Sequence, residues 1–210
     1  MPASLSATVS PAANVTTGAA TGRPLRLAVI TGSVREGRFG PTVARWFAER
    51  AAARPDLTVD VVDLAGSDAE LPLHMAAPGP GGAALTARLD AADAFVVITP
   101  EYNHSYPAGL KNVIDWHREE WHAKPIGFVS YGGLSGGLRA VEHLRVVFAE
   151  LHAVTVRDTV SFHLVWNQFD DQGRLAEPAG PEGAATAMLD QLAWWGDALR
   201  AARSTRPFAA

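Results

Sequence analysis

The stretch LRLAVITGSVREGRFGP, residues 25–41, carries the signals that decide the fold. Its first part is almost entirely apolar and includes Val29 and Ile30, which suits a strand covered on both faces in a parallel sheet. A glycine-rich turn follows, and Pro41 then stands where the first turn of a helix tolerates a missing amide hydrogen. The stretch therefore predicts a buried strand, a turn and a helix, in that order.

The rest of the chain repeats this alternation. Further apolar runs of strand length lie at residues 57–62, 94–99, 125–130 and 154–160. Helical patterns lie at residues 41–55, at about 82–90, after Pro107, after a predicted cap at Ser135, and around residues 188–199. Five strands alternating with helices predict an α/β domain with a doubly wound parallel sheet. Five strands fit the flavodoxin-like order 2-1-3-4-5 better than the six strands of a dinucleotide-binding fold.

Composition excludes several classes of protein. The chain has 210 residues, no cysteine and a formal net charge of −4. The absence of cysteine excludes disulfides, thiolate metal sites and cysteine nucleophiles. The slightly acidic balance argues against a nucleic-acid partner. No apolar run approaches the roughly twenty residues that a membrane span requires, so we expect no membrane association.

Residues 1–22 differ in character from the rest of the chain. They contain no Lys or Arg and no continuous apolar block, so they match neither a secretory signal nor an organelle transit peptide. Their Ala, Ser, Thr, Pro and Gly content predicts a disordered N-terminal tail. We expect residues 23–210 to form a single domain, and we expect the protein to be cytoplasmic.

The loop after the first strand has the composition of an anion-binding turn. In an open α/β sheet, ligands bind beyond the carboxyl ends of the strands, where the strand order reverses. This loop contains three glycines, Ser33, Arg35 and Arg38 ahead of a helix. Amides, a hydroxyl, two guanidinium groups and a helix N-terminus together predict a cradle for a phosphate monoester. It matches neither the Walker A nor the Gly-x-Gly-x-x-Gly pattern, and a basic surface turn is the alternative.

Two further loops complete this edge of the sheet. The loop after the third strand reads PEYNHSYP over residues 100–107, and the loop after the fourth reads SYGGLSGG over residues 130–137. All three tyrosines of the chain, Tyr102, Tyr106 and Tyr131, lie in these two loops. Aromatic and glycine-lined walls beside a phosphate cradle suit a planar ring with a phosphorylated tail, which is the shape of flavin mononucleotide (FMN).

Several of these segments are similar to the motifs of one known family. They are GSVR at residues 32–35, PEYN at 100–103 ahead of LKN at 110–112, and the glycine pairs at 132–133 and 136–137. Over residues 25–156 the chain resembles the NAD(P)H-dependent FMN reductases, a family of flavodoxin-like quinone, azo and chromate reductases. PEYN ahead of LKN is the specific part of the resemblance. The resemblance implies FMN as cofactor, NADPH or NADH as hydride donor, and a homodimer or a dimer of dimers.

The resemblance also implies the residues of the site. Ser33 and Arg35 would hold the phosphate of FMN. The family often has Ser and Asn where this chain has Arg38 and Gly40, so Arg38 would share the phosphate charge and backbone would replace a side-chain cap at Gly40. Residues 100–103 would edge the isoalloxazine ring on one side, and Ser130, Gly132 and Gly133 on the other. The expected cofactor-binding residues are Ser33, Arg35, Arg38, Phe39, Gly40, Pro100, Glu101, Tyr102, Asn103, Ser130, Gly132 and Gly133.

The expected chemistry needs no acid or base from the chain, so we predict no catalytic residue. The amides of Tyr102 and Asn103 are expected to donate to ring N5, and the glycine-rich start of the fourth helix to stabilise charge near N1. A reduced nicotinamide and then a quinone, a free flavin or a similar small acceptor would use one face of the ring, which predicts ping-pong kinetics. His104 would contact an acceptor, with a solvated loop histidine as the alternative.

Two functions of other classes stay open. The first is a non-enzymatic flavodoxin-like electron carrier. Such carriers need a strongly acidic docking face, which a net charge of −4 over 210 residues does not favour. The second is a sensor of a phosphorylated ligand that binds no flavin.

Other conspicuous residues have structural interpretations. His117 and His122 flank two glutamates, but a spacing of five places them off a common helical face, so no metal site is predicted. Most tryptophans, among them Trp46, Trp121 and Trp194, are expected in the core or in an interface. Residues 157–175 are expected to form a long excursion after the fifth strand, with a turn and a small hairpin.

Overall fold

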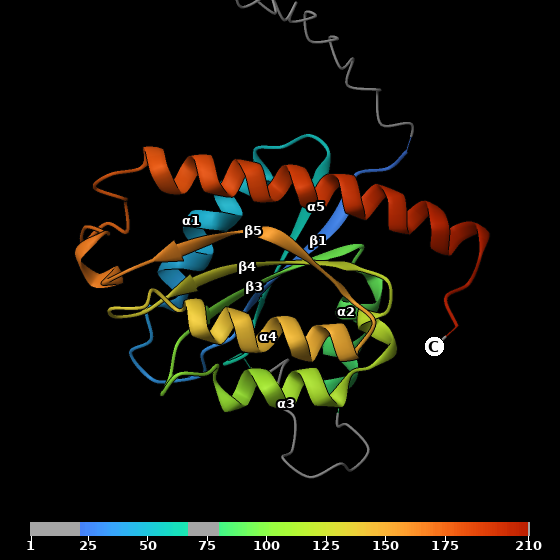
Figure 1. The fold of residues 1–210 in the computed structure, drawn as a ribbon, viewed down its shortest axis with the longest axis horizontal. Coiled ribbons are helices and arrows are strands. Elements are labelled where there is room, and N and C mark those ends of the chain that lie inside the picture. The colour runs from blue at the N-terminus through green and yellow to red at the C-terminus, as the bar shows by residue number, and fades with distance from the viewer. Residues whose placement is uncertain (1–21, 67–79, 210) are drawn as a thin grey trace, which may run out of the picture.

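The computed structural model describes residues 22–66 and 80–209 of the chain. Within them, five parallel strands form one sheet in the order β2-β1-β3-β4-β5 (Figure 1). The doubly wound fold and the strand order predicted from the sequence are therefore confirmed. The predicted disordered tail lies outside the described residues, except for Gly22.

The elements follow the predicted alternation, and the first strand ends where it was predicted, whereas the other four strands end one or two residues later than expected. The strands are β1 Leu25–Thr31, β2 Leu57–Asp63, β3 Ala94–Pro100, β4 Pro125–Tyr131 and β5 Val154–Phe162. The helices are α1 Gly40–Ala52, α2 Pro80–Ala91, α3 Ala108–Trp116, α4 Leu138–Glu150 and α5 Ala179–Thr205. Two short 3₁₀ turns are η2 Glu119–Trp121 and η3 Val165–Asn167. None of the described helices combines the length and the apolar character that crossing a bilayer requires.

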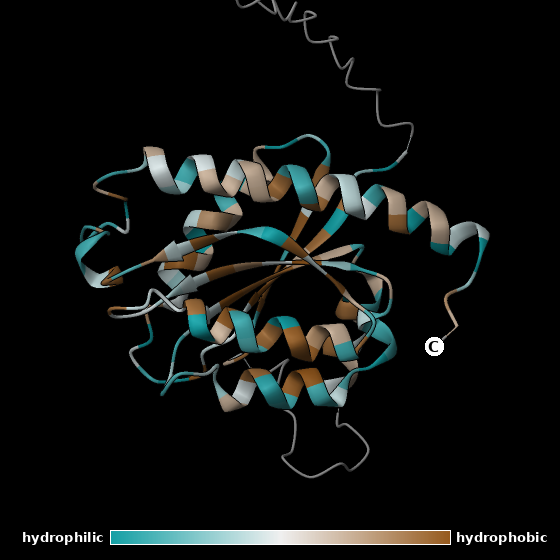
Figure 2. Ribbon diagram, viewed as in Figure 1, coloured by the Kyte–Doolittle hydropathy of each residue, from teal (hydrophilic) through white to brown (hydrophobic). Residues whose placement is uncertain are grey.

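The sheet separates two hydrophobic cores. Leu27 and Val29 of β1 pack with residues of α1 and α5, whereas Ala28 and Ile30 pack with residues of α2, α3 and α4. This division follows from the strand geometry, because successive side chains point to opposite faces of a sheet. Figure 1 shows α5 on one side of the sheet and α3 and α4 on the other, and Figure 2 shows hydrophobic residues concentrated in the strands. Strand β1 is thus buried on both faces, as its composition predicted.

Helix α5 lies unusually close to β4. A Cβ atom added to Gly127 would lie 2.9 Å from Met188 Sδ and 3.0 Å from Leu192 Cδ1. Both of these α5 side chains are buried. The absence of a side chain at Gly127 therefore allows the helix to approach the sheet.

Three local features bear on predictions made from the sequence. Helix α4 is capped by Gly137, which has a φ of 86°, so the predicted cap at Ser135 is wrong. Strand β5 continues to Phe162, so the excursion begins later than residue 157. The small hairpin is confirmed by an antiparallel bridge between Phe169 and Leu175.

Candidate functional site

The loops after β1, β3 and β4 lie at one edge of the sheet and are joined by backbone hydrogen bonds. The Gly32 amide donates to Ile98 O at 2.8 Å, which ties the first loop to β3. The Glu101 amide donates to Tyr131 O at 3.2 Å, which ties the second loop to the end of β4. The three segments in which we predicted a ligand site are therefore brought together by the strand order β1-β3-β4.

The first loop combines a fixed hydroxyl with an unneutralised cation. Ser33 is fully buried, and its Oγ lies 2.7 Å from Tyr102 Oη in the second loop. Arg35 is exposed, and its guanidinium lies 5.3 Å from the centroid of the Tyr102 ring. Arg35 forms no ion pair with any residue in the described part of the chain. Its charge is therefore available to an anion at this edge of the sheet.

Two neighbouring residues have partners within the protein. Arg38 Nη2 lies 2.6 Å from Asp63 Oδ2, so its guanidinium closes the loop onto the end of β2. Its expected share in binding a phosphate stays a prediction. Phe39 is the N-cap of α1, and its ring packs edge-on against Phe169 with the centroids 5.6 Å apart.

Gly40 is the first residue of α1, and it lies close to the side chains of Thr31 and Tyr131. No side chain caps this helix, and its N-cap is Phe39, one residue before the position at which a backbone cap was expected. A Cβ atom at Gly40 would lie 2.9 Å from Thr31 Cγ2 and 2.9 Å from Tyr131 Oη. The hydroxyl of Tyr131 is buried and has no hydrogen-bond partner among the described residues. Burial, with a smaller effect from Tyr102, raises the pKa of Tyr131 well above its usual value, although the nearby Ser33 hydroxyl acts in the opposite direction. Ser33 Oγ is hydrogen-bonded to Tyr102 Oη, so the Tyr131 hydroxyl remains a neutral donor without a partner of its own.

The second loop contains a two-residue hairpin turn. The amides of Tyr102 and Ser105 donate to each other's carbonyl oxygens at 2.8 and 3.0 Å. Asn103 and His104 between them have φ values of 49° and 70°, in the left-handed region. The Tyr102 amide is therefore already used, which corrects its expected role as a donor to a flavin ring. The Asn103 amide has no such partner in the described residues and keeps that role as a prediction.

Glu101 joins the second loop to α4. Its carboxylate accepts hydrogen bonds from Ser135 Oγ at 2.6 Å and from the Arg139 amide at 3.2 Å, and it lies 2.5 Å from Arg139 Nη2. Burial alone would raise the pKa of Glu101, but Ser135 and Arg139 outweigh that effect and hold the pKa below its usual value. Ser135 therefore serves Glu101 instead of capping the helix. Arg139 also donates to His104 Nε2 at 2.6 Å.

The third loop is fixed by hydrogen bonds from two serine side chains. Its carbonyl at Gly136 accepts hydrogen bonds from Ser130 Oγ and Ser161 Oγ, both at 2.8 Å. Gly137 has a positive φ, and a Cβ atom there would lie 2.7 Å from Ser130 Cβ, so only glycine fits. Ser130 is fully buried and fixes the loop from within. Pro100, at the end of β3, is likewise buried.

Gly132 and Gly133 are bracketed by the segment after β5. The amide of Val165 donates to Gly132 O at 3.2 Å, and that of Leu164 donates to Gly133 O at 2.9 Å. Trp166 lies beside Gly133, and 57% of its surface is exposed. The glycine pair therefore exposes its backbone, without side chains, at the edge of the site, and Trp166 lies next to it.

Sequence reasoning missed Arg139, and it did not show where the hydroxyl of Tyr131 lies. Tyr131 was noted for its place in the third loop, but nothing in the sequence showed that its hydroxyl reaches the start of α1. Arg139 lies 38 residues from Glu101 in the chain. No local pattern pairs residues so far apart.

Of the two histidines considered for a metal, His117 makes structural hydrogen bonds. His117 Nδ1 donates a hydrogen bond to Val113 O at 2.7 Å, and its Nε2 is hydrogen-bonded to Thr86 Oγ1 at 3.0 Å. Over residues 22–66 and 80–209, no three potential ligand side chains are grouped as a metal site requires. Trp46 and Trp121 are buried in the two cores, as expected, whereas 65% of the Trp194 surface is exposed.

Comparisons with known proteins point to one family. A family model described as NADPH-dependent FMN reductase matches residues 25–167. An NAD(P)H-dependent FMN reductase of Schizosaccharomyces pombe is 37% identical over 127 residues, which span 53% of this chain and 60% of that protein. A probable NADPH:quinone oxidoreductase of Oryza sativa subsp. japonica is 30% identical over 187 residues, covering 84% of this chain and 92% of that protein.

Solved structures show the same fold at lower sequence identity. FerB, a flavoenzyme NAD(P)H:(acceptor) oxidoreductase from Paracoccus denitrificans, matches with a TM-score of 0.66 and 22% identity. The match covers 83% of this chain and 98% of that one. The likeness supports the flavodoxin-like architecture independently of the sequence motifs.

Proposed function

The chain belongs to the NADPH-dependent FMN reductase family, and on that premise we propose that it binds FMN where the loops after β1, β3 and β4 meet. We propose further that it passes hydride from a reduced nicotinamide to quinones, free flavin or similar small aromatic acceptors. The observation that carries the proposal is the unneutralised Arg35 and the unpartnered Tyr131 hydroxyl beside the N-terminus of α1.

The residues present fit the phosphate of FMN. Arg35 offers a free positive charge, and the start of α1 adds the positive end of a helix dipole. Buried hydroxyls normally have a partner, so the hydroxyl of Tyr131 indicates a place for a ligand oxygen. Gly40 keeps that place free, because any side chain there would collide with Tyr131 Oη.

The second and third loops suit the planar ring. Gly132 and Gly133 place backbone without side chains at the edge of the site, which permits close approach of a flat ligand. Glu101 is hydrogen-bonded to Ser135 and to the Arg139 amide, so it fixes the spacing between the loop after β3 and the loop after β4. The site is thus preorganised by contacts that do not involve the ligand.

When bound, FMN supplies the acceptor and donor of hydride, and the chain supplies binding and electrostatics. Arg35 and the helix N-terminus hold the phosphate, and the Asn103 amide is proposed to donate to ring N5. The start of α4 supplies a positive dipole near N1. Glu101 stays ionised because of its low pKa, so it is not proposed as a proton donor.

Several finer features stay predictions. Ping-pong kinetics follow if the nicotinamide and the acceptor occupy the same face of the ring in turn. The choice between NADPH and NADH, the homodimer or dimer of dimers and the cytoplasmic location rest on the sequence and the resemblance.

Anaerobic mixing tests the proposed function. FMN-loaded protein is mixed with NADPH or NADH without any partner protein, and the flavin absorbance is followed. We expect rapid bleaching, with recovery when a quinone is added, and parallel double-reciprocal lines in the steady state. Free FMN without the protein is the control. Flavin that bleaches only after a partner reductase is added would identify an electron carrier, and a preparation that binds no FMN would favour the phosphate-ligand sensor.

A further inference from the structure

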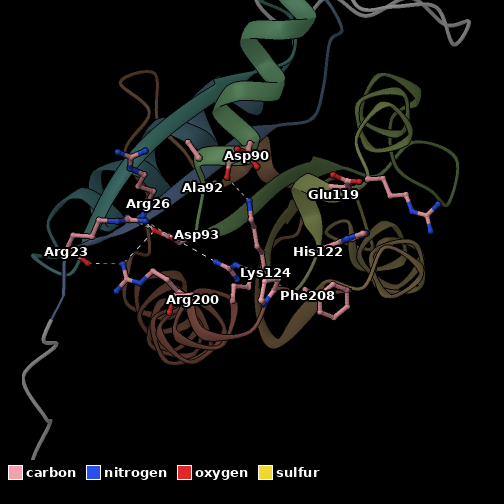
Figure 3. Close-up of a pocket in the computed structure, with 15 residues that line it drawn as sticks. Arg23, Arg26, Asp90, Ala92, Asp93, Glu119, His122, Lys124, Arg200 and Phe208 are labelled. Atoms are coloured by element: carbon pink, nitrogen blue, oxygen red, sulfur yellow. Dashed lines mark hydrogen bonds and ion pairs between the residues drawn. The ribbon is translucent and has the colours of Figure 1, made fainter. Parts of the chain in front are cut away.

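A separate cavity of about 920 Å³ opens at the opposite end of the sheet, away from the three loops of the candidate site. It lies where β1 and β4 begin, between the end of α2, the η2 turn and the last turns of α5 (Figure 3). Pro207 and Phe208, which follow α5, form part of its wall. The proposed function uses none of these residues.

Positive charge predominates around this cavity. Six of the side chains that line it are cationic, namely Arg23, Arg26, Arg118, Lys124, Arg200 and Arg203. Only three are acidic, namely Asp90, Asp93 and Glu119. The excess is notable because the whole chain carries a net charge of −4.

The acidic side chain at the centre of the cavity is Asp93, and three guanidinium groups surround its carboxylate. Its side chain is only 6% exposed, and it accepts hydrogen bonds from Arg23 at 2.7 and 3.1 Å. Arg200 and Arg203 approach the same carboxylate at 3.7 and 3.9 Å, which is too far for good hydrogen bonds. One carboxylate therefore faces three cations, as Figure 3 shows for Arg23 and Arg200.

Lys124 adds a buried cation without an acidic hydrogen-bond partner. Its Nζ donates to the carbonyl oxygens of Leu89 and Asp90 at 3.1 and 2.9 Å, at the end of α2. An ammonium group has three donors, so one makes no hydrogen bond within the described residues, although Nζ also lies 5.5 Å from the centroid of the Phe95 ring. Burial and the charge of Arg203 lower the pKa of Lys124 to about 8.

From this arrangement we propose that the cavity is a binding site for a small molecule carrying a diphosphate or a similar multivalent phosphate group. Arg200, Arg203 and Lys124 would contact the phosphate oxygens. Guanidinium groups match phosphate geometry with paired N–H donors. Arg200 already donates to Arg23 O at 2.9 Å and pairs with Asp197 Oδ1 at 2.7 Å, and Arg203 donates to Ala123 O. Because each guanidinium has five N–H donors, both side chains keep donors for a phosphate. The volume admits an organic portion as well, which would lie against Phe208.

Phosphate binding at this site is coupled to protonation of Lys124. The charged groups that act on Lys124 are Arg203 of α5, Asp90 and Asp93 between α2 and β3, and Glu120 of η2. A bound polyanion adds negative charge beside the ammonium and raises its pKa. Because the pKa of the free site is about 8, binding near pH 8 takes up protons.

The test is isothermal titration of inorganic pyrophosphate into FMN-saturated protein, in which the phosphate cradle near Arg35 is filled. The Arg35→Ala variant is titrated in parallel, so that a failure of FMN binding does not obscure the result. We expect saturable binding that Arg200→Gln and Lys124→Met each weaken by about tenfold. Arg157→Gln, at a side chain that is 91% exposed and outside the cavity, is the control and should change nothing.

Two buffers of different ionisation enthalpy measure the protons taken up at pH 8, and we expect Lys124→Met to abolish the uptake. Circular dichroism confirms that each variant is folded. If Lys124→Met does not fold, Arg200→Gln alone tests the binding site. The proposal is overturned if pyrophosphate does not bind, if Arg200→Gln binds it as well as the wild type does, or if chloride at equal ionic strength gives the same heat. Binding only to vesicles of anionic lipid would also overturn it.

Discussion

The buried hydroxyl of Tyr131 has no partner, although it lies at the start of α1 where a phosphate is proposed to bind. A buried donor without an acceptor costs free energy in the protein without ligand. The same group becomes favourable once an anionic oxygen fills the cradle. Stability and ligand affinity should therefore respond in opposite directions to its removal.

Tyr131→Phe tests this reasoning. We expect the free energy of unfolding of the flavin-free protein to stay the same or to rise by about 1 kcal/mol, because an unsatisfied polar atom is removed. We expect FMN to bind about five- to tenfold more weakly. Urea denaturation and fluorescence titration measure the two effects. Tyr106→Phe is the matched control, and unchanged FMN affinity in Tyr131→Phe would exclude the hydroxyl from the cradle.

Among the elements, the loop after β3 and helix α4 are joined by the Glu101 carboxylate. Since the pKa of Glu101 in the folded protein lies below its ordinary value of 4.5, the ionised group contributes stability above that pH. The contribution disappears as the pH falls through the folded-state pKa. The two loops beside the proposed flavin ring should then loosen together.

Glu101→Gln should lower the free energy of unfolding by about 1–3 kcal/mol at pH 7, because charge-assisted hydrogen bonds to a buried side chain are lost. The difference from the wild type should shrink as the pH falls through the folded-state pKa of Glu101, below which both side chains are neutral. Urea denaturation across this range measures it. Glu142→Gln, at a side chain that is 75% exposed, should change stability by under about 0.5 kcal/mol. A difference for Glu101→Gln that does not depend on pH would contradict the assignment.

The packing of α5 on β4 gives a second test among the elements. Gly127→Ala places a methyl group against Met188 and Leu192, so we expect a loss of about 1–3 kcal/mol in the free energy of unfolding. Gly183→Ala, in α5 with no atom within 4 Å of the added carbon, should be neutral or stabilising. Thermal or urea denaturation of both variants decides the point, and equal stability of the two would show that α5 packs less closely than described.

The elements themselves could be predicted from the sequence because burial on both faces of a parallel strand leaves a continuous apolar run, as in LRLAVIT. The edge that carries the site followed from the strand order. The pairings within the site could not be predicted. The sequence suggests Ser135 as a helix cap, but its hydroxyl donates to Glu101 from another loop. The sequence likewise suggests an unpaired Arg38, but Asp63 at the end of β2 forms an ion pair with it. Such contacts are set by tertiary packing, which local patterns do not contain.

In the molecule as a whole, the two ends of one sheet carry different chemistry. The carboxyl ends of β1, β3 and β4 gather the glycine loops, the tyrosines and Arg35. The amino ends of β1 and β4 border a cation-rich cavity around Asp93. The parallel sheet separates the two sites, so each can be altered without touching residues of the other.

Arg35 and the loop after β1 are proposed to bind the phosphate of FMN. The most direct test compares FMN with riboflavin, which has the same ring and no phosphate, in the wild type and in Arg35→Ala, with Arg157→Ala as the control. We predict that Arg35→Ala weakens FMN by about tenfold to a hundredfold, from the loss of charge-assisted contacts, and leaves riboflavin affinity unchanged. Unchanged FMN affinity, or an equal loss for FMN and riboflavin, would contradict the claim.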